Sequence, residues 1–398
     1  MPKARLRDLG ITLGQLPAGP LNAITDVAGV TVGVSTIIRD QPHVARSGVT
    51  AIWPSPNVFS DFLPAGFHSF NGNGEMTGTI WLAEQGLIAS PICITNTHAV
   101  GVVRDAIVEL AAKRNIEMAW HLPVTAETYD GWLSDAEHFP VTSADAIAAL
   151  ESAKGGAVPE GNVGGGTGMV CHEFKGGNGT ASRRLSAEQG GWTVGAFVQA
   201  NYGMRNMLRC GHAPVGLEIT DEIVPVPERL KKPKTDQGSI IVILATDAPL
   251  IPIQCQRLAR RATTGLAWVG GFGSNSSGDI FLAFSTGNHV PMKTPMANLR
   301  MLGMDECTPL FQAAAEATEE AIWNAMIAAE TMTGWQGRVV NAIPHDLLQQ
   351  ACARYALAMA GLFGLGLGYT WAFIDPERQF LHDRLARTRI IKVAPQGA

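Results

Sequence analysis

The segment from Thr235 to Leu244, "TDQGSIIVIL", limits the possible folds of this chain more than any other. Five consecutive apolar residues, Ile240 to Leu244, begin directly after the dipeptide Gly238-Ser239. The segment before them, 225–238, is polar, rich in proline and almost free of large apolar residues. A short run of β-branched and aliphatic residues bounded by turn signals predicts a fully buried strand. We therefore expect a rigid core strand that is entered abruptly from a polar loop.

The length and composition allow that strand a large core. The chain has 398 residues, of which 46% are hydrophobic and 16% charged, so a disordered protein is excluded. No second hydrophobic core begins at 225–238. We interpret that segment as a loop inside one domain covering 1–398.

Charge and cysteine content restrict the partners and the compartment. The net charge of −5 and the absence of a basic stripe argue against nucleic acid, and we interpret the basic cluster at 229–234 as a solvated loop. Six cysteines without a CxxC pair predict buried free thiols in a reducing compartment. No apolar run reaches the roughly 18 residues that span a bilayer. We predict a cytoplasmic protein that uses no cofactor and no metal ion.

Strand patterns dominate the first half of the chain, and long helical patterns dominate the second. Strands are expected at 29–38, 47–54, 90–101, 192–203, 240–245 and 279–286, and helices at 142–153, 249–263, 308–332 and 345–361. The segment 97–115 is expected to be a strand that runs into a helix. The glycine-rich segment 155–190 fits neither a helix nor an ordinary strand. This order predicts an α+β fold in which helices cover sheets.

The segment Gly161 to Gly168, "GNVGGGTG", first suggests phosphate binding. A Walker loop needs Lys after its last Gly, but Thr167 follows Gly166, and a Rossmann fingerprint needs Gly where Met169 stands. Tight turns or a close backbone approach explain these glycines more simply. Their N–H groups could also line a substrate cleft. A non-catalytic protein that binds phosphate or nucleotide through 161–168 stays open as an alternative function.

The sequence context of the histidine residues does not indicate a catalytic site. Ten His residues are scattered along the chain, and none lies in a GxSxG or HExxH context. His98, in "NTHAVG", follows an expected strand and is a candidate, but a single His is usually a hydrogen-bonded structural residue.

The Gly238-Ser239 dipeptide fits the chemistry of an N-terminal nucleophile. Gly238 has no Cβ, so its carbonyl is open to attack and strained φ/ψ angles are tolerated. The polar loop before it can move away once cut, whereas the strand after it holds a new N-terminus still. The Ser239 hydroxyl would attack the Gly238 carbonyl, and the freed α-amine, with an ordinary pKa near 8, would serve as its general base.

Several motifs in order along the chain resemble the DmpA-type aminopeptidases, which include L-aminopeptidase/D-amino-acid esterase-amidases and β-aminopeptidases. The principal ones are "NVGGGTGMVCHEFKGGNGTASR" (162–183), "QGSIIVILATDAPL" (237–250) and "SSGDIFLAFSTGN" (276–288). Shorter ones are "NAITDVAGVTVG" (22–33), "NGNGEMTG" (71–78), "AETYDGWLSD" (126–135) and "VQANYG" (198–203). The resemblance implies a self-cleaving serine hydrolase with a four-layer αββα sandwich.

The resemblance also implies a processed assembly. Cleavage before Ser239 would leave 1–238 and 239–398 associated as a pair, and several such pairs, commonly four, would form a homo-oligomer. The substrates implied are short peptides, amides or esters with a free amine. Related hydrolases of nylon-type ω-amino-acid oligomers form an alternative on the same fold, although those use an N-terminal Thr.

Site residues follow from the resemblance position by position. Ser277 and Asp279 match a serine and an acidic residue that position the Ser239 amine and hydroxyl, although some β-aminopeptidases have Glu where Asp279 stands. Residues two apart on a strand share a face, so this pair can reach one site. Asn201 matches an oxyanion-hole donor.

Two further residues match the family's contacts to substrate. Tyr129, in "ETYDG", matches a tyrosine that faces the reacting carbonyl. Glu127 matches a carboxylate that pairs with the substrate's free α- or β-ammonium group. Such a pair would explain aminopeptidase rather than endopeptidase action.

Overall fold

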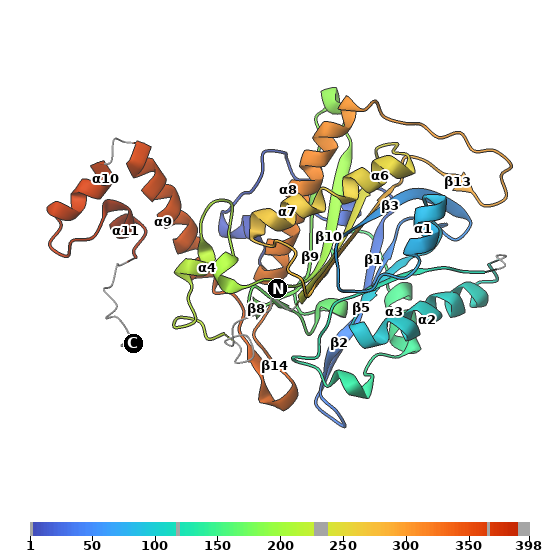
Figure 1. Cartoon of the computed structure of the whole chain (residues 1–398), viewed down its shortest axis with the longest axis horizontal. Helices are drawn as coiled ribbons and strands as arrows, with labels where there is room; N and C mark the ends of the chain where they lie inside the picture. Colours follow the sequence, from blue (N-terminus) through green and yellow to red (C-terminus); the bar gives the residue numbers. More distant parts are fainter. Residues whose placement is uncertain (1–2, 117–119, 227–237, 364–366, 389–398) are drawn as a thin grey trace.

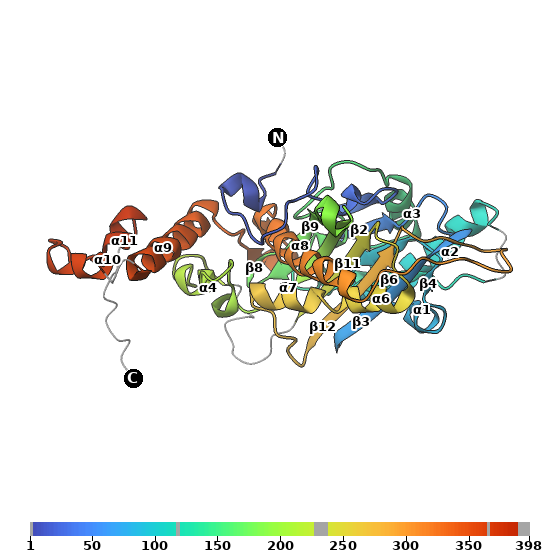
Figure 2. The ribbon, with the colours of Figure 1, turned by 90° about the horizontal axis from the view of Figure 1, so that it is seen from above.

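The computed structural model describes residues 3–116, 120–226, 238–363 and 367–388. Two β-sheets are stacked face to face, and helices cover the outer face of each sheet (Figures 1 and 2). The expected strand at 240–245 is the centre of the larger sheet. Most of the polar loop before it, residues 227–237 with the basic cluster, lies outside the described residues.

The smaller sheet has four strands in the order β1-β2-β5-β6, of which only β5 and β6 are parallel. Its strands are β1 (Thr31–Arg39), β2 (Ala45–Trp53), β5 (Ile92–Thr95) and β6 (Val124–Glu127). The helices α2 (Val100–Lys113) and α3 (Ser143–Glu151) pack on its outer face. Thr142 caps α3 by accepting a hydrogen bond from the Asp145 N–H.

The larger sheet has seven strands in the order β13-β3-β12-β11-β10-β9, with β4 paired to β3. Its strands are β3 (Asp61–Gly72), β4 (Leu87–Ile88), β9 (Gly177–Arg184), β10 (Thr193–Asn201), β11 (Gly238–Thr246), β12 (Ser277–Ser285) and β13 (Val290–Pro291). The strands β11 and β12 are parallel, and the other pairs are antiparallel. The crossover between β11 and β12 carries α6 (Pro252–Ala259) and α7 (Ala262–Val269), which lie with α8 (Thr308–Ile327) on the outer face.

The remaining described α-helices and strands are short or peripheral. They are α1 (Thr79–Gln85), α4 (Val215–Glu218), the ribbon of β7 (Val170–Cys171) and β8 (Phe174–Lys175), the ribbon of β14 (Met332–Thr333) and β15 (Val339–Val340), and the C-terminal helices α9 (His345–Phe363), α10 (Leu367–Thr370) and α11 (Leu381–Leu385).

Three apolar cores fill the three interfaces between layers. Alternate residues of β11 divide between two of them: Ile241 and Ile243 pack between the sheets, whereas Ile240, Val242 and Leu244 face α6, α7 and α8. A third core lies between the smaller sheet and the helices α2 and α3. The predicted four-layer αββα sandwich is therefore confirmed.

Four sequence-based expectations need correction. The strand expected at 90–101 covers only Ile92–Thr95, because Asn96 then caps a short helical turn that leads into α2. Residues 177–184 form an ordinary strand, β9, because its small residues let α8 approach closely: a Cβ on Gly179 would lie 2.0 Å from the Ala321 carbonyl oxygen. The single helix expected at 249–263 is two helices, α6 and α7. The helix expected at 308–332 ends at Ile327, since the chain then enters β14.

The helices α9, α10 and α11 form an arm that extends away from the two sheets (Figures 1 and 2). Arg354 ties it to the body through Glu218 of α4 and to α11 through Asp383. Several apolar side chains of the arm are exposed, including Phe373 at 91% and Ile374 at 72%.

All six cysteines are free, and five are buried, as the sequence predicts; Cys352 on α9 is half-buried. Among the described residues, no helix has the length and apolar character needed to cross a membrane.

Candidate active site

Ser239 is the second residue of β11 and is only 4% exposed. Its Cα is paired with Asn201 of β10 on one side and with Gly278 of β12 on the other. Neighbouring strands lie about 4.8 Å apart, so three segments that are distant in the sequence meet at this serine. Ser239 shares a sheet face with Ile241 and therefore points toward the smaller sheet.

Gly238 lies where no side chain can fit. A Cβ at this position would lie 2.4 Å from the Asn201 carbonyl oxygen and 2.7 Å from Tyr202 Cα. The sequence suggests an accessible carbonyl as the reason for this glycine, and the structure adds a second reason, the close approach of β10.

We expect Gly238→Ala to destabilise the fold by about 1–3 kcal/mol, because an added methyl group would force β10 and β11 apart. Thermal denaturation of the chain with an intact Gly238-Ser239 bond measures this. The matched control is Gly101→Ala in α2, where a Cβ meets nothing within 4 Å, so this variant should not be destabilised. Equal stability of the two variants would contradict the close approach.

Ser277 and Asp279 lie together at the start of β12, and both are buried. The Ser277 hydroxyl donates a hydrogen bond of 2.7 Å to Asp279 Oδ1. The predicted shared face is therefore found. Phe281, on the same face of β12, packs in the core between the larger sheet and the helices α6, α7 and α8. The Ser239 side chain points to the opposite face of the sheet, toward the smaller sheet. Since Ser277 pairs with Gly238, it lies beside the Gly238-Ser239 peptide bond rather than beside the Ser239 hydroxyl.

The Asn201 side chain joins three segments. Its Oδ1 accepts a 2.8 Å hydrogen bond from the Val170 N–H, and its Nδ2 donates a 3.0 Å bond to the Tyr129 carbonyl oxygen. Asn201 lies on the same sheet face as Ser239, because both face the smaller sheet. The amide is thus held rigidly, with its N–H₂ group directed toward the segment that follows β6.

Glu127 ends β6 and is 4% exposed. Its carboxylate accepts hydrogen bonds from the Thr97 hydroxyl and from the Glu75 N–H. Burial raises the pKa of Glu127, and these two hydrogen bonds partly offset that rise. A Cβ on Gly74 would lie 3.0 Å from Glu127 Oε1 and 3.2 Å from Gly278 Cα. Gly74 therefore lies between the Glu127 carboxylate and Gly278, the residue of β12 that pairs with Ser239.

Tyr129 is 41% exposed, which makes it the most accessible of the predicted site residues. Its ring lies 6.0 Å from that of His98, edge to face. Its hydroxyl packs closely over Gly131, where a Cβ would come within 2.1 Å of the oxygen. His98 Nδ1 lies 3.4 Å from the Ala136 carbonyl oxygen, so the ring that packs against Tyr129 is itself positioned by the backbone.

The glycine-rich segment serves close packing between the two sheets. The N–H groups of Gly164 and Gly165 donate to the hydroxyls of Thr36 and Thr50 in the smaller sheet. A Cβ on Gly165 would lie 2.1 Å from Gln199 Oε1 in the larger sheet. Because these N–H groups are already bonded within the protein, the structure supports a close backbone approach, not a phosphate cradle.

Sequence reasoning missed four residues that support the site. Gly278 has no room for a Cβ, which would lie 2.6 Å from the Asn73 carbonyl oxygen. Lys175 is fully buried and donates from Nζ to the Met169 and Gly176 carbonyl oxygens, so it fixes the segment that binds Asn201.

Asp130 and Gly74 are the other two residues that support the site and that the sequence did not indicate. Asp130 follows Tyr129 and is 1% exposed, and burial raises its pKa to about 7. The only sequence signal for these four residues is their place inside the family motifs.

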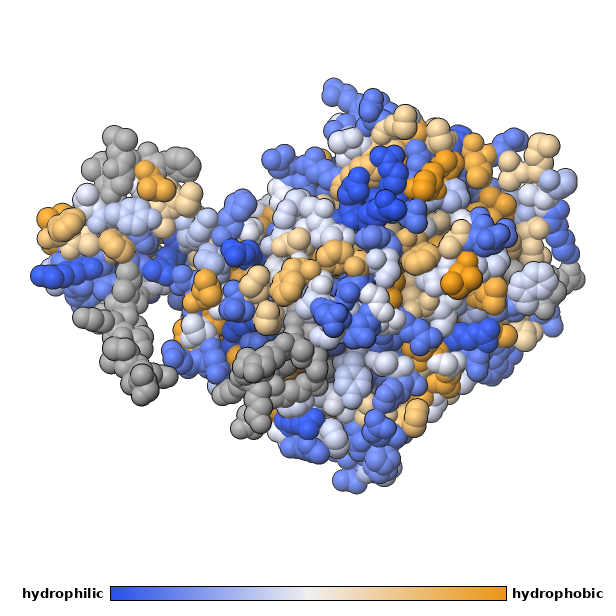
Figure 3. Space-filling model, in the orientation of Figure 1, coloured by the Kyte–Doolittle hydropathy of each residue, from blue (hydrophilic) through white to orange (hydrophobic). Residues whose placement is uncertain are grey.

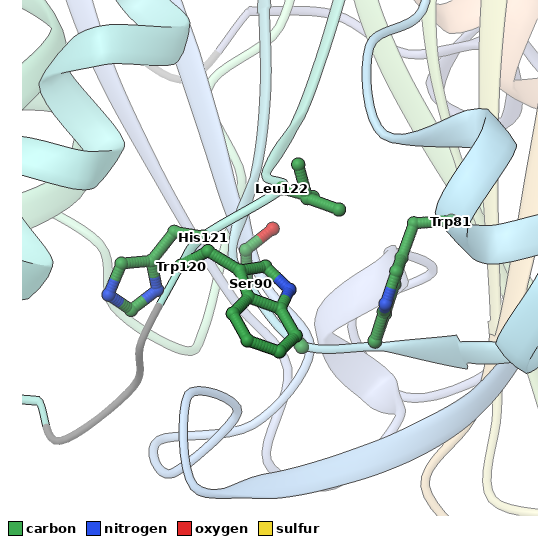
Figure 4. A pocket seen from close by; sticks show the side chains of 6 residues that line it. Trp81, Ser90, Trp120, His121 and Leu122 are labelled. Carbon is green, nitrogen blue, oxygen red and sulfur yellow. The ribbon is translucent and has the colours of Figure 1, made fainter.

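A shallow pocket lies apart from these residues, near the beginning of β6 and beside α1 (Figure 4). Trp81, Ala89, Ser90, Trp120, His121 and Leu122 line it. Because Glu127 stands at the other end of β6, this pocket is not part of the arrangement around Ser239.

Comparison with known proteins agrees with this geometry. Residues 22–340 match the model of peptidase family S58. The β-peptidyl aminopeptidase BapA of Sphingosinicella microcystinivorans is 44% identical over 366 residues, which cover 88% of this chain and 92% of that protein.

Solved structures of similar proteins have the same fold. A β-aminopeptidase from Burkholderia sp. is 48% identical with a TM-score of 0.83, covering 87% of this chain and 98% of that one. The L-aminopeptidase D-Ala-esterase/amidase of Ochrobactrum anthropi, described as a prototype serine aminopeptidase with a variant Ntn-hydrolase fold, is 45% identical with a TM-score of 0.82, covering 88% and 99%. The resemblance seen in the sequence is confirmed: this chain belongs to peptidase family S58, the serine aminopeptidases with an Ntn-hydrolase fold.

Proposed function

We propose that this aminopeptidase cuts itself between Gly238 and Ser239 and then uses Ser239 as its nucleophile. The cut would divide one domain into 1–238 and 239–398, which stay associated through the continuous larger sheet. The observation that carries the proposal is the position of Ser239: it starts a buried strand between Asn201 and Gly278, with the Glu127 carboxylate one glycine away. Freed Ser239 attacks the amide or ester carbonyl of a substrate that has a free N-terminal amine.

The freed α-amine supplies the general base. It would stand where the Gly238-Ser239 peptide bond lies in the uncut chain, and there Ser277 is the neighbour on β12. The Ser277 hydroxyl already donates to Asp279, so it can accept a hydrogen bond from the amine and hold it toward the Ser239 hydroxyl. Proton transfer to the amine activates the hydroxyl, an acyl-enzyme forms as the leaving amine or alcohol departs, and water then releases the acid.

Asn201, Tyr129 and Glu127 have the remaining roles. Asn201 Nδ2 donates to the oxyanion that forms on the attacked carbonyl, in place of its present bond to the Tyr129 carbonyl oxygen. The half-exposed Tyr129 faces the reacting group from the open side. Glu127 pairs with the substrate's ammonium group, which explains the requirement for a free amine.

Denaturing electrophoresis with N-terminal sequencing tests the proposed cut. We expect two fragments, one of which begins with Ser239-Ile240-Ile241. A single band of 42.2 kDa that keeps full activity after long incubation would overturn the proposal.

We expect Glu127→Gln to raise KM for amino acid amides about 10- to 100-fold with a smaller change in kcat. The amide keeps the shape of the side chain but removes the charge, and a hydrogen bond to a charged group is worth about 1.5–3 kcal/mol. In the wild type, KM should also rise as the pH falls through the pKa of Glu127, which burial places above that of an ordinary glutamate. This rise of KM at low pH, the acid limb of the pH profile, should be absent in the variant.

Steady-state kinetics between mildly acidic and neutral pH measures both effects. The control is Glu75→Gln, an exposed neighbour whose negative charge raises the pKa of Glu127. This control should keep the neutral-pH KM and move the acid limb to lower pH. An unchanged KM in Glu127→Gln would remove Glu127 from substrate binding.

We further propose that β-amino acyl amides are among the substrates, since relatives at 44–48% identity are named as β-aminopeptidases. A panel of β-alanyl, L-alanyl, D-alanyl and ω-amino acyl amides decides among them. The nylon-type alternative would be favoured if the ω-amino acyl substrates react fastest. The non-catalytic alternative would be favoured by saturable binding of ATP or NAD without self-cleavage.

The processed pairs should form a homo-oligomer, with four pairs as the expected number. The C-terminal arm supports self-association, because it projects from the body and carries apolar residues on its surface (Figure 3). Phe373 and Ile374 are among its exposed side chains. Sedimentation analysis gives the mass, and Phe373→Asp with Ile374→Asp should lower it if the arm contacts a second copy.

We propose a cytoplasmic location because all six cysteines are free, and a reducing compartment keeps thiols in this state. Cell fractionation tests it.

A further inference from the structure

Two imidazoles and one carboxylate meet outside the proposed catalytic residues. His43 lies in the turn between β1 and β2, whereas Asp135 precedes the short helical turn Ala136–His138 and His138 is its last residue. The ligand atoms of the three residues all lie within 4.8 Å of one another. The two rings are stacked, with centroids 3.4 Å apart and planes inclined by 16°.

Both imidazoles turn Nδ1 toward the same carboxylate oxygen. His138 Nδ1 is 2.9 Å and His43 Nδ1 is 3.8 Å from Asp135 Oδ2. A zinc ion with bonds of about 2.0–2.2 Å to nitrogen and oxygen requires tetrahedral ligands separated by roughly 3.3 Å. The observed separations lie on either side of that value. Because an imidazole nitrogen binds an ion in the plane of its ring, at least one of the two rings has to turn out of the stack when the ion binds.

The backbone around these side chains is held in place. The Asp135 N–H donates to the Val44 carbonyl oxygen at 2.8 Å, and the Arg46 N–H donates to Ser134 Oγ at 3.1 Å. These bonds tie the turn that carries His43 to the segment that carries Asp135. The two His side chains are 46% and 47% exposed, whereas Asp135 is 13% exposed, so an ion can enter from solvent onto a half-buried carboxylate.

We propose that His43, Asp135 and His138 form a binding site for a divalent transition-metal ion of the zinc type. Imidazole nitrogen suits zinc, nickel and copper, whereas calcium and magnesium prefer sites made entirely of oxygen ligands. Three protein ligands leave the fourth position to water.

The site lies close to the residues that surround Tyr129. The Ala136 carbonyl oxygen lies 3.4 Å from His98 Nδ1, and the His98 ring is 6.0 Å from both Tyr129 and Phe139. A bound ion would therefore rigidify the segment that supports Tyr129. It takes no part in the chemistry at Ser239.

Equilibrium dialysis of tag-free protein against micromolar zinc chloride, with metal analysis, tests the proposal. We expect one zinc ion per chain, no comparable binding of magnesium or calcium, and an increase in melting temperature with zinc. His43→Ala, His138→Ala and Asp135→Asn should each weaken zinc binding at least about tenfold, as loss of a ligand or its support does.

Two control variants separate this site from other zinc-binding groups. His289→Ala removes an imidazole from an exposed pair with Asp61, at 2.7 Å, that has no second histidine in contact among the described residues. Cys352→Ser removes the half-buried thiol. Both should bind zinc like the wild type. Circular dichroism, and activity in the presence of a chelator, should show that the His43 and His138 variants are folded. Wild-type zinc affinity in His138→Ala, or less than half an ion per chain in the wild type, would overturn the proposal.

Discussion

Ser239→Ala is expected to remain a single chain of 42.2 kDa and to lose hydrolytic activity by about 10⁶-fold in kcat. The same hydroxyl is needed twice, first to attack the Gly238 carbonyl and then to attack the substrate. The side chain is buried at the start of β11, and alanine removes only one oxygen atom from it. The folded structure should therefore survive, so that the loss can be assigned to chemistry.

Electrophoresis over days, N-terminal sequencing and amide hydrolysis measure these effects. Ser239→Cys and Ser239→Thr keep a nucleophile and should be cut slowly, whereas the alanine variant should not be cut at all. Ser186→Ala, at a position outside the strands, should be cut like the wild type. Complete processing of Ser239→Ala at Gly238 would show that another group attacks this bond.

Asn201→Ala is expected to lower kcat by about 10²–10³-fold, which corresponds to about 2.7–4 kcal/mol for the loss of one oxyanion donor. KM should change less, because the donor acts on charge that develops only in the transition state. Self-cleavage should slow as well, since Asn201 is the β10 neighbour of Ser239 in the uncut chain. Asn201→Asp places a negative charge at the donor position and should be at least as inactive.

Gln199→Ala is the matched control for this prediction. Gln199 is two residues earlier on β10, on the same face, and is buried; its Nε2 donates to the Thr95 carbonyl oxygen and to the Thr128 hydroxyl. Its loss should reduce stability and leave kcat close to the wild-type value. If Asn201→Ala keeps kcat within about threefold, the amide acts as a structural link to Val170 and Tyr129 and not as an oxyanion donor.

Sequence patterns predicted most of the fold because the strands and helices have clear periods. The apolar run of β11 and the helical spacing of α2 and α9 lie where expected. The pattern failed where tertiary packing overrides local preference. Glycine and other small residues argue against a strand at 177–184, yet β9 forms there because the neighbouring helix α8 needs a surface without large side chains.

The predicted site residues were found together at the inter-sheet face or at the adjoining strand ends, with one difference. Ser277 and Asp279 share a face, as expected, but it is the opposite face from the Ser239 side chain. No sequence pattern could reveal this, because the relation between two strands depends on their register. The parallel pairing of Gly238 with Ser277 assigns the Ser277–Asp279 pair to the amine rather than to the hydroxyl.

The sequence alone determined that a buried strand begins at Gly238-Ser239, that the chain resembles one hydrolase family, and which residue types were available for its chemistry. Those properties are local, since they depend on polarity, periodicity and motif order. Only the tertiary structure decided that Gly238 and Gly278 must lack side chains, and that Glu127 lies one glycine from the partner of Ser239. It also brought His43 to Asp135 and His138. The physical reason is that strand register and close packing join residues that are far apart in the chain, and the distances between such residues are not encoded in any local pattern.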